Sequence, residues 1–121
     1  MNKFDSNIPI YLQIIDIFKA NILNGEYQPG SKIPSVRELG VKFGVNPNTV
    51  QRALVELERS KLLRTENRTA GRYISDDQDL IASLKKNEVK SKVKHLLKEL
   101  KDAGFKNDEI LELMKDEMKS S

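Results

Sequence analysis

Four polar side chains of the kinds that bind DNA bases lie within one short stretch of the chain. They are Asn48, Thr49, Gln51 and Arg52. Asn and Gln form paired hydrogen bonds with adenine, Arg does so with guanine, and Thr contacts a thymine methyl group or a phosphate. Solvated surfaces often carry acidic residues, yet this stretch has none before Glu56. The alternative is a surface that is merely solvated, and the residue types favour contact with DNA.

The sequence around these side chains predicts two short helices joined by a tight turn. Ser35 and Glu38 have the spacing of a capping box, which starts a helix at residue 36. Gly44 ends that helix, because glycine accepts the left-handed conformation without a Cβ clash. Asn46 is then a good N-cap and Pro47 fits the first helical position. We therefore expect a second helix to begin at Pro47.

The second helix has one apolar face and one polar face. Its apolar residues recur at i, i+3, i+4 and i+7, and they are Val50, Ala53, Leu54 and Leu57. If that face is buried, the polar side chains of the first two turns point outward. In a helix-turn-helix, the second helix lies in the major groove and contacts bases through its N-terminal residues. The free N–H groups at its start also favour a phosphate.

The segments on either side predict the rest of a DNA-binding domain. Tyr11, Ile14, Phe18 and Ile22 form the apolar stripe of an earlier helix, which we assign to the core. Residues 62–65 and 72–74 read as two short strands, and a hairpin after a helix-turn-helix is the wing of a winged helix. Three wing residues are candidates for phosphate or minor-groove contact, namely Arg68, Thr69 and Arg72. The alternative is a hairpin that merely covers the core.

Composition narrows the class of protein. Residues 1–75 hold eleven Lys and Arg against seven Asp and Glu, whereas residues 76–121 hold ten Lys against eleven Asp and Glu. All six arginines lie in the first segment, which favours nucleic acid as its partner because the guanidinium group binds phosphate and guanine. The chain has no cysteine and one histidine, so it offers no metal or catalytic cluster. We expect no enzyme activity, cofactor or metal, and no membrane segment or signal peptide, hence a cytoplasmic protein.

Several blocks of the sequence follow one pattern in order. The blocks are Tyr11-Leu12-Gln13-Ile14, Gly25, Pro29-Gly30-Ser31, Ile33-Pro34-Ser35-Val36-Arg37-Glu38-Leu39, Val45-Asn46-Pro47-Asn48-Thr49-Val50, Arg52-Ala53 and Leu57-Glu58. The pattern strongly resembles the DNA-binding domain of the GntR family of bacterial transcription regulators, over about residues 8–75. The resemblance implies a winged helix-turn-helix. It also implies DNA contacts at Ser35, Arg37, Asn46, Pro47, Asn48, Thr49, Gln51 and Arg52, and in the wing at Arg68, Thr69, Gly71 and Arg72.

Four positions depart from the family pattern. Ser31 stands where Asp is usual, Gly40 where Ala is usual, Lys61 where a helix-ending Gly is usual, and Thr69 where the wing often has Gly. The first three are compatible with the fold, which absorbs them at modest cost. Thr69 bears on how closely the wing tip approaches the DNA backbone.

The last 46 residues predict two amphipathic helices. A polar patch at residues 85–88 shifts the phase of the apolar stripe, which predicts a kink or break near Asn87, and Asn107 is expected to cap the second helix. Neither helix buries its apolar face completely against the other, so a second copy of the chain would complete the burial. The alternatives are packing on the chain's own first helix and binding to a membrane surface. The candidate dimerisation residues are Leu84, Val89, Val93, Leu96, Leu97, Leu100, Phe105, Ile110, Leu111, Met114 and Met118.

These features together predict a mainly α-helical chain with a small β-hairpin. A winged helix-turn-helix domain would span residues 1–75 and a two-helix dimerisation segment residues 76–121. The short tail resembles the YtrA-type branch of the family, whose members dimerise through a helix pair and often control ABC-transporter genes. We expect a homodimeric repressor that binds a palindromic operator in double-stranded DNA. The alternative is a winged-helix adaptor that binds proteins, and the sequence does not identify a small effector.

Overall fold

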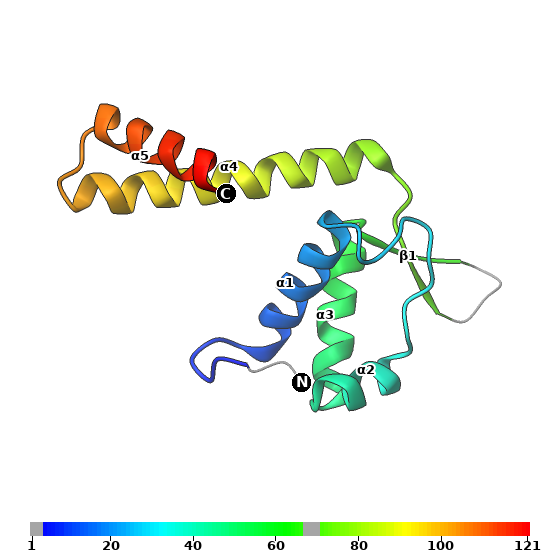
Figure 1. The fold of residues 1–121 in the computed structure, drawn as a ribbon. Helices are drawn as coiled ribbons and strands as arrows, with labels where there is room; N and C mark the ends of the chain where they lie inside the picture. The colour runs from blue at the N-terminus through cyan, green and yellow to red at the C-terminus, as the bar shows by residue number, and fades with distance from the viewer. Residues whose placement is uncertain (1–3, 67–70) are drawn as a thin grey trace. The chain divides into compact units, whose positions relative to one another are not determined.

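The computed structural model describes residues 4–66 and 71–121 (Figure 1). The chain divides into two compact units, Met1–Ala82 and Ser83–Ser121. Its elements in order are α1 (Ile10–Leu23), α2 (Val36–Phe43), α3 (Pro47–Arg59), β1 (Leu63–Thr65), β2 (Arg72–Ile74), α4 (Gln78–Asp102) and α5 (Asn107–Ser120). The prediction of a mainly α-helical chain with one small hairpin is confirmed.

Helices α1, α2 and α3 enclose the core of the first unit. From α1, the side chains of Ile14 and Phe18 have no exposed surface. The ring of Phe18 lies 5.2 Å from that of Tyr27 and 6.5 Å from that of Phe43, measured between centroids. On α3 the predicted stripe is buried, including Leu57, which is fully enclosed. The core therefore fixes which face of α3 points outward.

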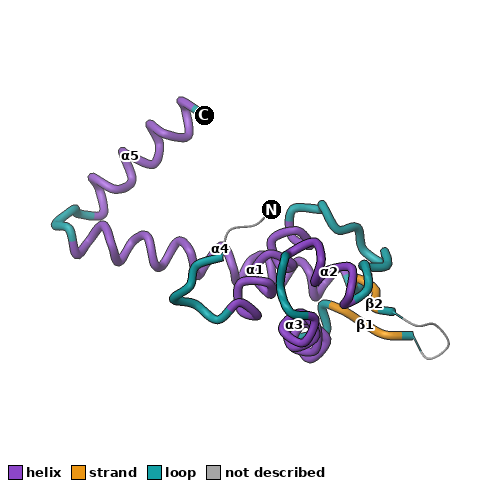
Figure 2. Tube along the Cα trace, turned by 90° about the horizontal axis from the view of Figure 1, so that it is seen from below, coloured by secondary structure: helices purple, strands orange, loops and turns teal. Residues whose placement is uncertain are grey.

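Strands β1 and β2 form an antiparallel hairpin that extends from the three helices (Figure 2). Thr65 pairs with Arg72, and Leu63 with Ile74. The loop before α2 adds to the other edge of β2, where Ile33 N donates to Arg72 O at 3.0 Å and Ile74 N donates to Ser31 O at 2.8 Å. Strand β2 is thus hydrogen-bonded along both edges, which holds the base of the hairpin against the helical core.

The second unit consists of the later part of α4 together with α5. Helix α4 runs through Asn87 without interruption, so the expected break there is wrong. Helix α5 begins at Asn107 rather than after it, with Lys106 as the cap residue, whose backbone N–H donates to the carboxylate of Glu109 at 3.0 Å. Gly104 makes the turn between the helices with a φ of 95°. In the described residues, none of the helices has the length and apolar character needed to span a bilayer.

Candidate DNA interface

The start of α2 is fixed by the predicted capping box. The Ser35 hydroxyl accepts from the backbone N–H of Glu38 at 3.1 Å, and the Glu38 carboxylate accepts from the backbone N–H of Ser35 at 3.2 Å. The hydrogen bond from the Ser35 backbone, followed by that from its side chain, lowers the pKa of Glu38 below its ordinary value. Arg37 is exposed beside this cap. Two of the predicted DNA contacts, Ser35 and Arg37, therefore lie together at the N-terminus of α2.

The turn before α3 has the predicted geometry. Gly44 takes the left-handed conformation, with φ 68° and ψ 37°, at the end of α2. The Asn46 side chain then accepts from the backbone N–H of Asn48 at 2.8 Å, and Pro47 occupies the first position of α3. These local contacts determine where α3 begins and so which side chains its first two turns present.

The outer face of α3 carries the four predicted base-contacting side chains. Asn48, Gln51 and Arg52 are exposed and Thr49 is half-buried. None of the four is acidic, and the opposite side of the helix is packed into the core. The arrangement presents amide, hydroxyl and guanidinium groups on one rigid element, and base recognition in the major groove uses these groups.

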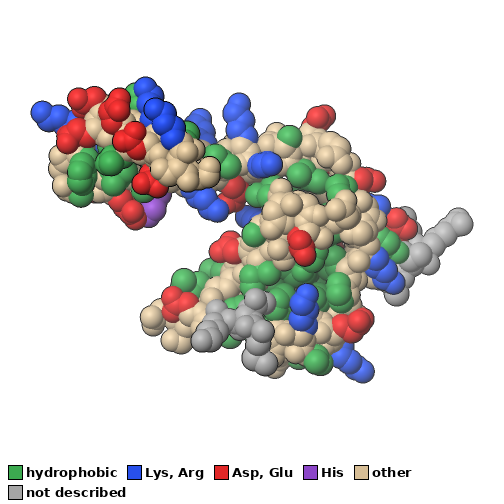
Figure 3. Space-filling model, viewed as in Figure 1, with side chains coloured by type: hydrophobic (Ala, Val, Ile, Leu, Met, Phe, Trp, Pro, Cys, Tyr) green, Lys and Arg blue, Asp and Glu red, His purple; other side chains and the backbone are tan. Residues whose placement is uncertain are grey.

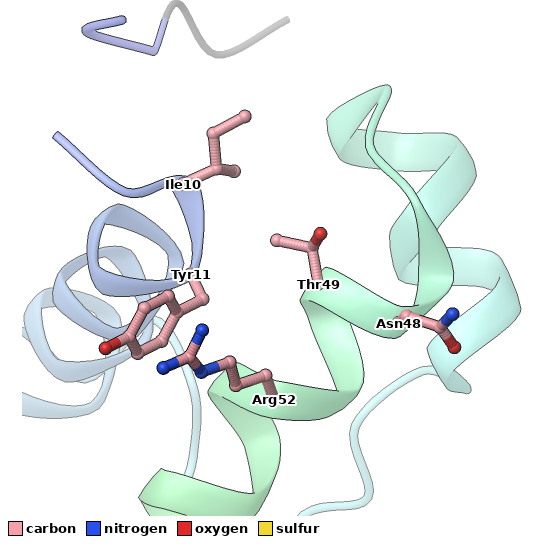
Figure 4. A pocket seen from close by; sticks show the side chains of 5 residues that line it. All are labelled: Ile10, Tyr11, Asn48, Thr49 and Arg52. Carbon is pink, nitrogen blue, oxygen red and sulfur yellow. The ribbon is translucent and has the colours of Figure 1, made fainter. Parts of the chain in front are cut away.

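Arg52 contacts the first helix as well as facing solvent. Its guanidinium carbon lies 3.8 Å from the centroid of the Tyr11 ring (Figure 4). An open pocket of about 350 Å³ separates the starts of α1 and α3, and it is lined by Ile10, Tyr11, Asn48, Thr49 and Arg52. In Figure 4 the Arg52 side chain extends toward Tyr11, whereas Asn48 points away from α1. Tyr11, which its place in the apolar stripe predicts to be a core residue, is half-buried and contacts Arg52, and helical spacing alone does not indicate this contact.

Arg72, in the wing, contacts two side chains of α3. Arg72 Nε donates to the carboxylate of Glu58, and its Nη2 donates to the amide oxygen of Gln51 at 3.3 Å. Gly71 precedes it with a φ of 123°, and a Cβ at that position would lie 2.7 Å from Cε of Lys32. The other two predicted wing contacts, Arg68 and Thr69, lie outside the described residues.

The second unit carries an open apolar groove between its two helices. Ile110 is buried, whereas Val93, Leu111 and Met118 leave half or more of their surface exposed. The groove is lined by Val93, Leu96, Leu97, Lys101, Asn107, Ile110, Leu111, Met114 and Met118. Figure 3 shows hydrophobic side chains at the surface of this unit among acidic and basic ones. Seven of the predicted dimerisation residues therefore meet in one groove.

The other predicted dimerisation residues lie outside the groove, three of them on α4 and Phe105 in the turn before α5. Leu84 and Leu100 are half-buried, and Val89 and Phe105 are exposed, at 54% and 41%. His95 pairs with Glu99 on α4 at 2.9 Å. In the part of the chain that the structure describes, no three His, Cys, Asp or Glu side chains are grouped as metal ligands.

Comparison with known proteins identifies relatives over more than nine-tenths of the chain. Residues 10–72 match the family model described as bacterial regulatory proteins, gntR family. The HTH-type transcriptional repressor YtrA of Bacillus subtilis is 38% identical, over 92% of this chain and 85% of that protein. A GntR family transcriptional regulator from Listeria monocytogenes has a similar structure, with a TM-score of 0.86 and 35% identity over 93% of this chain and 98% of that one.

A solved protein–DNA complex is also similar to part of the chain. The DNA-binding domain of AraR in complex with operator ORX1 has a TM-score of 0.53 and 26% identity, over 62% of this chain and 90% of that chain. The similarity therefore extends to a structure that contains a bound operator.

Proposed function

The chain belongs to the GntR family of bacterial regulatory proteins and is a DNA-binding transcriptional regulator of the YtrA type, and we propose that it represses transcription by binding a palindromic operator as a homodimer. The observation that carries the proposal is the outer face of α3. Asn48, Gln51 and Arg52 stand exposed in its first two turns, while its other side is buried. A helix fixed in this way keeps its base-contacting groups in a constant geometry, as major-groove recognition requires.

We propose that different residues contact the DNA phosphates and the bases. Ser35, Arg37 and the N-terminus of α3 would contact phosphates, because helix starts and arginines bind anions. Asn48, Gln51 and Arg52 would contact base edges and set the preferred sequence. The predicted DNA-binding domain, residues 1–75, would therefore supply both affinity and specificity.

The apolar groove of the second unit supports the homodimer. Leu111 and Met118, which line it, remain 55% and 74% exposed. Burying such side chains against a second copy removes apolar surface from water, at about 25 cal/mol per Å². Residues 76–121 would then form the dimer interface, and two-fold pairing would place two α3 helices about one DNA turn apart. The YtrA-type resemblance extends the proposal to control of an ABC-transporter operon.

Selection from a random DNA library tests the proposal. The expected result is enrichment of one two-fold-symmetric sequence, bound by a species whose sedimentation gives two protein chains per duplex. A library that remains random after several rounds at low salt would contradict the proposal and favour a winged-helix adaptor for proteins.

A further inference from the structure

The guanidinium group of Arg72 joins the wing to the recognition helix. It donates through Nε to Glu58 and through Nη2 to the amide oxygen of Gln51, at 3.3 Å for the second bond. The side chains of Arg72 and Glu58 are only 18% and 29% exposed. Arg72 is therefore engaged with two side chains of α3 before any DNA is bound.

Both ends of this arrangement are fixed by the backbone. Arg72 pairs with Thr65 across the hairpin, and its carbonyl accepts from the backbone N–H of Ile33 at 3.0 Å. Gln51 and Glu58 are seven residues apart, so they lie two turns apart on one side of α3. A planar guanidinium group spans such a pair because its N–H groups form a rigid fork.

The contact determines the orientation of the Gln51 amide. A guanidinium group donates hydrogen bonds and accepts none, so the Gln51 atom that meets it must be the amide oxygen. The amide NH₂ group of Gln51, which is an exposed residue, then remains available as a donor. We infer that Arg72, held by Glu58, is a positioning residue that presents the Gln51 NH₂ group to a base acceptor in the major groove.

The inference rests on the proposed function and deepens it, because it names the kind of base atom, a hydrogen-bond acceptor, that Gln51 contacts. Purine N7, guanine O6 and thymine O4 are the major-groove acceptors, whereas cytosine offers only a donor there. Gln51 thus selects against cytosine on the strand that it contacts. Glu58 takes part in this selection although its carboxylate, being negatively charged, does not bind phosphate.

The competing role for Arg72 is direct contact with a phosphate, as its sequence position indicates. The two roles give opposite results for Glu58→Gln. If Arg72 positions Gln51, removing the Glu58 charge loosens Arg72 and weakens the base preference. If Arg72 binds phosphate, the same change frees it and strengthens binding to every DNA sequence, with about one more unit in the salt slope.

The experiment compares binding of the full chain to a set of duplexes that vary one base pair of its selected sequence at a time. Gln51→Ala first identifies the base pair whose preference depends on Gln51. Glu58→Gln and Arg72→Lys are then measured on that set, because the lysine keeps the charge but not the fork. Glu56→Gln is the matched control, since it removes one negative charge from α3 at a residue that pairs with Arg59 instead. Thermal unfolding verifies that each variant is folded.

The expected result is that Glu58→Gln and Arg72→Lys both reduce the affinity ratio at the Gln51 base pair by about fivefold or more, and leave the other positions unchanged. The salt slope of Glu58→Gln should equal that of Glu56→Gln, because each removes one negative charge. The salt slope of Arg72→Lys should equal that of the native chain. A preference kept in either variant, or a Gln51→Ala variant with every preference intact, would overturn the inference while the proposed function stands. Native protein with no preferred sequence would overturn both.

Discussion

Replacing Tyr11 by leucine removes the aromatic ring beneath the Arg52 guanidinium and keeps an apolar side chain at the start of α1. The guanidinium carbon lies 3.8 Å from the ring centroid, which places the group over the ring. Its N–H groups lie in the plane of the group and remain free to donate to DNA. Tyr11 therefore orders Arg52 without occupying its donors.

Two energies determine the size of the effect. An exposed cation–π contact contributes about 0.5–1 kcal/mol, which is small against the roughly 4–12 kcal/mol expected for a unit of this size, so the Tyr11→Leu variant should remain folded. Ordering a free arginine upon binding costs about 0.5–1.5 kcal/mol. Operator affinity should consequently fall by about two- to tenfold.

The assay is a double-mutant cycle on operator affinity. Tyr11→Phe keeps the ring and should bind within about twofold of the native chain. In an Arg52→Ala background, Tyr11→Leu should have no further effect, because the side chain that it orders is gone. Equal losses for leucine and phenylalanine, or the same loss for leucine with and without Arg52, would refute the reasoning.

Three further predictions concern stability and assembly. Lys61→Gly should raise the free energy of unfolding in urea by about 0.5–1 kcal/mol, because Lys61 has a left-handed φ of 67° that its Cβ disfavours, and Lys61→Ala should give no such gain. Glu38→Gln should lower the urea midpoint more at pH 7 than at pH 3. The pKa of Glu38 is lowered in the folded chain, so the ionised carboxylate stabilises the fold above the ordinary value of 4.5, and this stabilisation is lost as the pH falls through the folded-state pKa. An equal difference in urea midpoint between the two proteins at both pH values would contradict this. Leu111→Glu should shift the sedimenting species from dimer to monomer, whereas Lys115→Glu, which also places a carboxylate on α5 and changes the net charge by more, should leave a dimer; two dimeric variants would exclude the groove as the interface.

Local signals in the sequence predicted the elements that present the site. The Ser35–Glu38 box, the left-handed Gly44 and the Asn46 cap each depend on residues a few positions apart, and all three have the expected geometry. The apolar stripe beginning at Val50 identified the buried face of α3, and so its outer face, because helical spacing alone determines it.

Contacts between distant segments could not be read from the sequence. The stack of Tyr11 on Arg52 depends on how α1 crosses α3, and the contact of Arg72 with Glu58 depends on where the hairpin meets α3. The expected break near Asn87 failed for a related reason. A change of phase in the apolar stripe was taken as a change in the backbone, but a lysine-rich helix continues through it because its side chains favour helix and are exposed to water.

The central claim is that the outer face of α3 reads a DNA sequence, and a salt series on DNA binding by the native chain and by Arg52→Ala tests it most directly. The native chain should prefer one palindromic sequence over random DNA, with an affinity that falls steeply as salt rises. Arg52→Ala should lose much of that preference yet keep most of the salt slope, since phosphate contacts elsewhere remain. Weak binding without preference by both proteins would contradict the claim.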